Sequence, residues 1–319
     1  MAMPRTDRRR FLAISAVAAA GLPGTARAAP PLVVWRGQAL GAMASIRLAH
    51  PDRMAAERLI GDCVAEIARL EAIFSLYRAD SAVCRLNTEG ALDAPPLELV
   101  ELLSRCAAFS ERTGGVFDVT VQPLFRRYAE HFAAPDADPA GPPIEDALVL
   151  VGWRGVEIGP ERVAFARRGM AITLNGVAQG YITDRVAELL RAGGMTDVLV
   201  DLGELRALGR HPDGRPWRTG LAGRTETLEL GGGLPALAVS SGAGSPFEPT
   251  ARLNHLLDPA TGRCADPQRL VAVLAPDATT ADALATALAV LPVRRARALA
   301  AALPEIRELL LPGSAAPAH

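Results

Sequence analysis

Two oxygen-bearing side chains near the end of the chain have the spacing of ligands for a hard metal ion. Asp282 and Thr286 lie four positions apart in the segment TTADALAT, residues 279–286. A helix would place both side chains on one face, one turn apart. Magnesium prefers near-octahedral oxygen ligation, with one or two carboxylates and with waters and substrate phosphates completing its shell. The pair therefore indicates a magnesium site, although an acid in a first helical turn and a helix hydroxyl also occur without a metal.

A single histidine precedes a strongly predicted turn. His255 comes shortly before Asp258-Pro259, and Thr261-Gly262 follows. Proline fixes one backbone dihedral and glycine permits the reversal, so this loop is expected to be well defined. An imidazole exchanges protons near neutral pH, which makes His255 a candidate general base, with Asp258 as the residue that orients it. A hydrogen-bonded structural histidine and a turn-forming aspartate are the alternatives.

A third candidate site joins a predicted strand to a predicted helix at residues 173–181, TLNGVAQGY. Backbone N–H groups at a helix start bind anionic phosphates, aided by the helix dipole. Gly176 and Gly180 allow a ligand or another backbone to approach closely. The spacing differs from the GxGxxG pattern, and no Walker motif occurs in the sequence. The ordinary dinucleotide and nucleoside triphosphate folds are therefore disfavoured.

Five segments are predicted to be helices from their apolar periodicity or from their start and stop signals. In the first, apolar side chains recur at helical spacing from Leu59 to Ile73, and the second ends at Gly114-Gly115, as helices often do. The predicted helices span residues 54–74, 96–114, 178–191, 280–290 and 293–302. The candidate metal ligands Asp282 and Thr286 would thus lie on the fourth helix.

Short runs with strand character are predicted between these helices. They span residues 149–151, 162–166, 171–174, 198–201, 218–221, 225–230, 237–240 and 270–274, and residues 135–143 are predicted to form a surface loop. Groups of strands separated by groups of helices favour an α+β fold, with mixed or antiparallel sheets flanked by helices.

The charge balance and the cysteines exclude several classes of function. The chain has 34 basic and 35 acidic side chains, so no overall field attracts nucleic acid, and no basic patch stands out. Its four cysteines lack CxxC spacing, which argues against a structural zinc site. Cys63 and Cys106 fall on apolar helix faces and are predicted to be buried thiols. No segment after residue 30 has the length and apolarity of a membrane span.

The first 28 residues are predicted to be a twin-arginine signal peptide and not part of the folded domain. Arg8, Arg9 and Arg10 precede an apolar run, residues 11–22, that is too short to span a bilayer. Small residues at 26–28 would supply the signal peptidase site. We therefore expect a periplasmic protein whose folded domain spans residues 29–312, followed by a disordered tail at residues 313–319.

Five motifs in series resemble the ApbE family of FAD:protein FMN transferases over nearly the whole mature chain. The first two are similar to residues 40–42 (LGA) and to residues 75–81 (SLYRADS), which Arg85 and Asn87 follow. The most specific is GVFDVTVQPL at residues 115–124, which is nearly the family's GxFDxTVxPL. The family's HxxDPxTG is present at residues 255–262 and its ADxxxT at residues 281–286. The resemblance implies an ApbE-like architecture, related to the T-fold.

The resemblance also implies roles for individual residues. A magnesium ion would be bound by Asp282, Thr286 and the backbone carbonyl of Gly176. The residues that would contact FAD, the substrate, are Leu40, Tyr77, Val116, Phe117, Asp118, Thr173, Gln179 and Leu257.

Three positions depart from the family pattern. The usual threonine of the opening motif is Ala42, the usual aspartate before the glycine loop is Thr173, and the usual lysine is Gln179. The form NGxAQGY at residues 175–181 resembles the NosX branch, which is associated with nitrous oxide respiration. That resemblance implies that the acceptor would be the flavin-carrying membrane regulator of that pathway.

The expected activity is the magnesium-dependent transfer of the FMN half of FAD to a threonine or serine hydroxyl of a target protein, with release of AMP. Magnesium would neutralise charge on the pyrophosphate, and His255 would accept the proton of the attacking hydroxyl. One alternative is an FAD diphosphatase that uses water in place of the protein hydroxyl. The other is a non-catalytic periplasmic FAD-binding accessory protein, which the substitutions at Ala42, Thr173 and Gln179 keep open.

Overall fold

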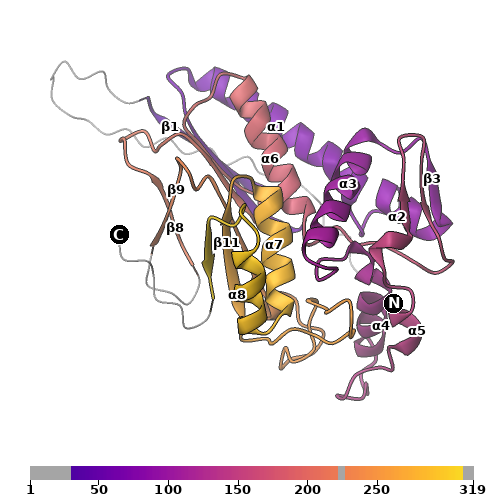
Figure 1. The fold of residues 1–319 in the computed structure, drawn as a ribbon. Coiled ribbons are helices and arrows are strands. Elements are labelled where there is room, and N and C mark those ends of the chain that lie inside the picture. Colours follow the sequence, from indigo (N-terminus) through magenta and orange to yellow (C-terminus); the bar gives the residue numbers. More distant parts are fainter. Residues whose placement is uncertain (1–29, 222–226, 312–319) are drawn as a thin grey trace, which may run out of the picture.

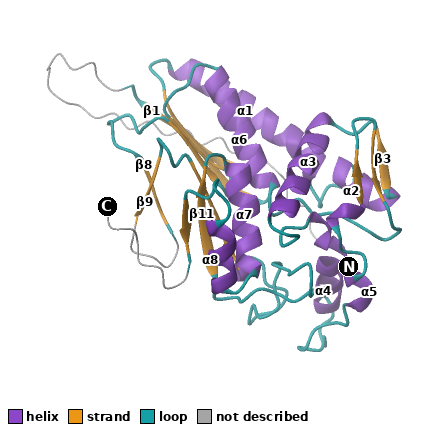
Figure 2. Cartoon of the chain, viewed as in Figure 1, coloured by secondary structure: helices purple, strands orange, loops and turns teal. Residues whose placement is uncertain are grey.

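In the residues that the computed structural model describes, 30–221 and 227–311, the centre of the protein is a seven-stranded sheet (Figures 1 and 2). Its strand order is β1-β2-β6-β7-β10-β11-β12, and all neighbours are antiparallel. The strands are β1 (Leu32–Ala39), β2 (Ala42–Ala49), β6 (Val198–Asp201), β7 (Leu205–Leu208), β10 (Ala236–Ser241), β11 (Leu270–Ala275) and β12 (Glu308–Leu310).

Both faces of the central sheet are buried. On β11, Val271, Val273 and Ala275 pack into the larger core under the helices, while Ala272 and Leu274 pack into a second core on the opposite face. The hairpin of β8 (Trp217–Gly220) and β9 (Thr227–Leu230) contributes to that second core. Successive side chains of a strand point to opposite faces, so a strand that is buried on both sides needs a continuous apolar run.

Four helices lie on one face of the sheet (Figure 1): α1 (Arg53–Phe74), α6 (Ala178–Ala192), α7 (Ala278–Val290) and α8 (Val293–Ala301). The carboxylate of Asp52 accepts hydrogen bonds from the N–H groups of Met54 and Ala55, which satisfies two free donors at the start of α1. Helix α7 packs against α6 and against strands β10 and β11. It is buried almost all round, which fixes the position of Asp282 and Thr286.

The remaining elements lie beside the end of the helical layer (Figure 1). They are α2 (Ala82–Glu89), β3 (Ala91–Asp93), α3 (Leu97–Arg112), α4 (Gln122–Phe132), α5 (Glu145–Leu148), β4 (Val156–Ile158) and β5 (Arg162–Phe165), with the three strands in the order β3-β5-β4. A third apolar cluster joins α4 to the loop that carries His255, because Leu124 and Tyr128 pack with Leu253 and Leu257. The Tyr128 hydroxyl donates to the Gly262 carbonyl at 3.1 Å.

The predicted α+β class with antiparallel sheets and flanking helices is confirmed. All five predicted helices are present as α1, α3, α6, α7 and α8. Six of the eight predicted strands are present in the described chain, as β5, β6, β8, β9, β10 and β11. Residues 135–143 form no helix or strand, as expected for a loop, and Cys63 and Cys106 are buried.

Two strand predictions are wrong. Residues 149–151 continue the turn at the end of α5, because the N–H groups of Val149, Leu150 and Val151 bond to carbonyls three or four residues earlier. Residues 171–174 pair with no strand. Ile172 instead exchanges two hydrogen bonds with the side-chain amide of Asn87, at 2.7 and 2.8 Å. An apolar run gave the same signal as a strand in both places.

Some predictions fall outside the described residues. The signal peptide, residues 1–28, and the tail, residues 313–319, are among them, as are residues 225 and 226 of the predicted strand at 225–230. Among the described helices, none has the length and apolarity needed to cross a bilayer.

Candidate active site

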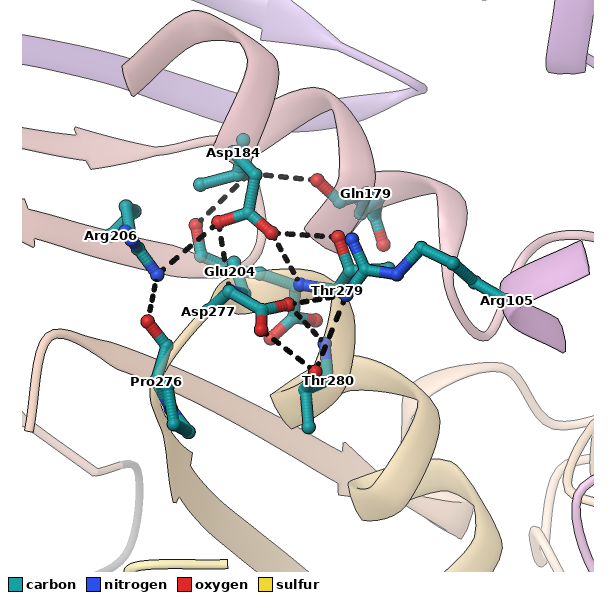
Figure 3. Close-up of polar contacts among 11 residues, drawn as sticks. Arg105, Gln179, Asp184, Glu204, Arg206, Pro276, Asp277, Thr279 and Thr280 are labelled. Carbon is teal, nitrogen blue, oxygen red and sulfur yellow. Dashed lines mark hydrogen bonds and ion pairs between the residues drawn. The ribbon is translucent and has the colours of Figure 1, made fainter. Parts of the chain in front are cut away.

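The start of α7 is fixed by a buried carboxylate from α6 (Figure 3). Asp184 accepts hydrogen bonds from the N–H groups of Ala278 at 2.9 Å and Thr279 at 2.8 Å, and from the Thr279 hydroxyl at 2.6 Å. Burial raises the pKa of Asp184, the charge of Asp277 raises it further, and Arg206 at 3.5 Å opposes them. These bonds satisfy orphan donors of the first turn and hold α7 against α6.

Close packing of the two helices places Asp282 at the site. An added Cβ at Gly180 would stand 2.9 Å from the Cβ of Asp282 and still closer to the Ala278 carbonyl, so only glycine fits. The Gly180 N–H donates to Asp282 Oδ2 at 3.0 Å. Burial raises the pKa of Asp282 to about 7, and the charge of Asp184 adds to this effect. The Asp282 carboxylate is thus held in place by a hydrogen bond, while burial disfavours its ionised form.

The three predicted metal ligands line one pocket, and two of them are in contact. The Thr286 hydroxyl lies 3.4 Å from the Gly176 carbonyl oxygen and 3.5 Å from the Ser240 hydroxyl. An added Cβ at Gly176 would lie 2.9 Å from Thr286 Oγ1, so the turn that precedes α6 fits directly against this part of α7. A carboxylate, a hydroxyl and a carbonyl are the oxygen donors that suit a hard divalent cation. The residues present therefore fit such an ion.

Among the described residues, no group of three or more His, Cys, Asp or Glu side chains could hold a metal ion. A site that relied on protein side chains alone would need more donors than Asp282 and Thr286 supply. Magnesium keeps several waters and commonly takes substrate phosphate oxygens as ligands. The few protein donors are therefore consistent with a cation whose shell is completed by water and by a phosphorylated substrate.

A pocket of about 290 Å³ opens beside these donors. Its size is at the lower end of the range for small-molecule sites. Apolar side chains such as Phe117, Phe125 and Leu256 line it together with polar ones. The predicted site residues that line it are Val116, Phe117, Asp118, Thr173, Gly176, Gln179, His255, Leu257, Asp282 and Thr286. Segments far apart in the sequence thus meet around one hollow.

The imidazole of His255 lines the same pocket. Its Nδ1 lies 3.2 Å from the Ser245 carbonyl oxygen. A carbonyl only accepts, so Nδ1 carries the proton in the neutral ring and Nε2 keeps a free lone pair. Burial lowers the pKa of His255, and the hydrogen bond to Ser245 partly offsets that shift. At neutral pH the ring is therefore able to accept a proton.

Asp258 stabilises its own turn and forms no hydrogen bond to His255. Its Oδ1 accepts from the Ala260 N–H at 3.0 Å, and its Oδ2 accepts from the Thr261 hydroxyl at 2.9 Å. The hypothesis that Asp258 orients the imidazole is thus replaced by the turn-forming alternative. The residue that orients His255 in the described chain is Ser245, through its backbone carbonyl.

Two of the predicted FAD contacts are not among the residues that line the pocket. Leu40 lies in the β1–β2 turn with a positive φ of 50°, and its N–H donates to Glu71 Oε1 at 2.6 Å. Tyr77 is 84% exposed. Asp118 does line the pocket, but its carboxylate binds the Thr120 N–H at 2.8 Å and the Trp153 N–H at 2.9 Å. Asp118 therefore holds the pocket wall together.

One acidic residue of the pocket was not predicted from the sequence. Glu204 lines the pocket with Asp282, although it lies between β6 and β7 and is only 7% exposed. The signal available in the sequence was an acidic residue directly after Leu202-Gly203, in a tight connection between two strands. That signal is weak, because such connections often carry acids that face solvent.

Comparison with known proteins shows similarity over most of the chain. A curated relative from Treponema pallidum, named FAD:protein FMN transferase, is 31% identical over 307 residues, covering 85% of this chain and 82% of its own. The solved flavin transferase ApbE from Vibrio cholerae has a TM-score of 0.74 at 26% identity, covering 88% and 93%. The apo form of the Pseudomonas stutzeri flavinyl transferase ApbE has a TM-score of 0.72 at 27% identity, covering 92% and 89%.

The fold and the pocket thus define an enzyme of the flavin-transferase class. Within that class, the chain belongs to the ApbE family, whose profile matches residues 40–310. The family match covers all the residues that surround the pocket.

Proposed function

We propose that this protein transfers the FMN half of FAD to a threonine or serine hydroxyl of another protein and releases AMP, with Mg²⁺ bound by Asp282, Thr286 and the Gly176 carbonyl. The observation that carries the proposal is that the Thr286 hydroxyl and the Gly176 carbonyl, 110 residues apart, lie together in a pocket that Asp282 also lines. The curated relative from Treponema pallidum, 31% identical, is named FAD:protein FMN transferase.

The chain's own residues supply distinct parts of the reaction. Magnesium, when bound, would neutralise charge on the pyrophosphate and stabilise the departing AMP oxygen. Nε2 of His255 accepts the proton of the attacking hydroxyl, since Nδ1 is engaged by Ser245. The apolar part of the pocket wall limits access of water that would compete with the acceptor hydroxyl.

We further propose that FAD lies along the pocket wall. The residues that would contact it are Leu40, Tyr77, Val116, Phe117, Asp118, Thr173, Gln179 and Leu257. The first two lie outside the lining of the pocket, and exposed Tyr77 is free to pack against a part of FAD that extends beyond it. Gln179 and Thr173 bring hydrogen-bonding groups without charge to this wall.

The acceptor is proposed to be the membrane flavoprotein regulator of nitrous oxide respiration. The support for this assignment is the NGxAQGY form of residues 175–181, which resembles the NosX branch. Mass spectrometry of that acceptor's flavin-binding domain, co-expressed with this protein, should show added FMN on a threonine or serine. An unmodified acceptor would remove the assignment without affecting the transfer activity itself.

The metal assignment is tested by Asp282→Ala. Purified protein with FAD, Mg²⁺ and an acceptor domain is expected to yield flavinylated acceptor and AMP. The variant should lower the rate by about 100-fold or more, because a catalytic cation stabilises the transition state by several kcal/mol. Asp62→Ala, an exposed position of α1, serves as the control and should react like the wild type. An unchanged rate in Asp282→Ala would show that the assignment is wrong.

The same assay separates two other activities. AMP formed at a comparable rate without any acceptor would identify an FAD diphosphatase. FAD that stays bound and intact when Mg²⁺ and acceptor are added would identify a binding protein that does not react.

We propose export to the periplasm by the twin-arginine leader, with residues 29–312 as the mature flavin transferase domain. The support is the order of the basic, apolar and small-residue segments in residues 1–28. Replacing Arg8 and Arg9 by lysine should retain the unprocessed protein in the cytoplasm, as measured by fractionation and N-terminal mass. Normal processing of that double variant would contradict this route.

A further inference from the structure

Glu204 is a buried carboxylate that the roles assigned so far do not use. It lies in the connection between β6 and β7, directly after Gly203, whose φ of +105° few other residues adopt. An added Cβ at Gly203 would also lie 2.6 Å from the side-chain amide of Gln179. The backbone conformation at Gly203 is thus restricted to one that places Glu204 in the wall of the pocket. Glu204 is only 7% exposed.

No cation in the described chain neutralises this carboxylate. Its Oε2 is fully buried and has no hydrogen-bond partner among the described residues. Burial raises the pKa of Glu204 well above its usual range, and the charges of Asp282 and Asp201 raise it further, while the Val239 N–H opposes them. A buried carboxyl whose second oxygen has no partner keeps its proton until a cation displaces it, and the cation then satisfies that oxygen.

A partner for the Glu204 carboxylate would have to carry positive charge and be small enough to enter the pocket. Glu204 and Asp282 line the same pocket, and the charge of Asp282 acts on Glu204. Two buried carboxylates with no lysine or arginine between them are stabilised by a divalent cation, which accepts one or two carboxylates in its shell. Thr286 and Gly176, whose oxygen atoms are the other proposed ligands, line the same pocket.

We propose that Glu204 is a second carboxylate for the divalent cation of this pocket, bound to the same ion as Asp282 either directly or through one water. This inference rests on the proposed metal site and adds a residue to it. It implies that the pocket takes up the cation before FAD arrives and releases protons as it does so, because two carboxylates bind the ion without help from substrate phosphates.

The test measures cation binding in the absence of FAD. Mn²⁺ and Mg²⁺ are titrated into purified protein by calorimetry at pH 8, and the rise in melting temperature with Mg²⁺ is recorded in parallel. Glu204→Gln keeps the shape and removes the charge, and it should raise the dissociation constant for Mn²⁺ by about 10-fold or more. It should also lose most of the melting-temperature rise. Glu111→Gln, an exposed position of α3, is the control for charge and should bind like the wild type.

The outcomes separate this inference from the metal site itself. Wild-type binding by Glu204→Gln, with binding lost in Asp282→Ala, would overturn the role of Glu204 and leave the metal site in place. Unchanged binding in both variants would overturn both. If Glu204→Gln does not fold, Glu204→Leu provides the same test, because an apolar side chain of similar volume removes the buried polar atoms altogether.

Discussion

At the residue scale, the protonation of His255 follows from its surroundings. Burial disfavours the charged imidazolium, and Nδ1 is engaged by the Ser245 carbonyl. The folded-state pKa therefore lies below the ordinary value of 6.5. The unfolded chain binds more protons in the window between these two values. The contribution of His255 to stability is thus present above pH 6.5 and is lost as the pH falls through the folded-state pKa.

The same shift predicts the pH dependence of the transfer rate. Because the neutral imidazole is the base, the rate at saturating Mg²⁺, which keeps Asp282 ionised, should be level at neutral pH and fall only on the acid side, with a midpoint below 6.5. His255→Gln should lower the rate by about 100-fold or more and remove this acid limb. His50→Gln, at a partly exposed histidine outside the pocket, is the control. A midpoint above 6.5 would contradict the assignment of His255 as the base.

The chemistry of individual residues was predictable only where a motif carried it. Asp282, Thr286 and Gly176 were predicted from short motifs, and the structure brings their oxygen atoms together. Glu204 was missed because it shares the pocket with Asp282, a residue 78 positions later, and no local spacing reports that proximity. The role of Asp258 was open for a similar reason, since a turn sequence does not show where the carboxylate points.

At the element scale, the packing of α6 against α7 depends on glycine. Gly180→Ala would push Ala278 and Asp282 away, and we expect it to lower the free energy of unfolding by about 1–3 kcal/mol. Transfer activity and cation binding should fall with it, because Asp282 moves. Gly61→Ala in α1 is the matched control, since an added Cβ there meets nothing within 4 Å. That variant should gain up to about 1 kcal/mol. Chemical denaturation and the transfer assay measure both effects, and equal stabilities would refute the packing argument.

Helices were easier to predict than strands in this chain. The apolar stripe of α1 has a helical period that no strand produces, and α3 ends at a pair of glycines. Strands β1 and β2 were missed, although they pair over eight residues in the sheet. The alternation of apolar and polar residues that identifies a strand is weak in both, because buried and partly exposed positions are mixed along each strand. Short elements such as β3, β4, β7 and β12 exist only through tertiary pairing, which a local pattern does not contain.

At the scale of the whole molecule, the four cysteines are free thiols in different surroundings. Cys63 and Cys106 are buried, and burial raises the pKa of Cys63 to about 12 and that of Cys106 further still. Cys84 and Cys264 are partly exposed, and burial raises the pKa of Cys264. Since the thiolate is the reactive form, a maleimide should label Cys84 first and Cys264 more slowly. Cys63 and Cys106 should react only after unfolding, as peptide mass spectrometry would show, and fast native labelling of Cys106 would contradict the core packing.

The pocket draws its wall from positions between 116 and 290, and the helix that completes it, α7, is among the last elements to leave the ribosome. A nascent chain that stops before residue 270 has no Asp282, no Thr286 and no closed hollow. Such a chain lacks the side chains proposed to bind the metal ion. The proposed catalytic site is therefore complete only when synthesis is almost finished.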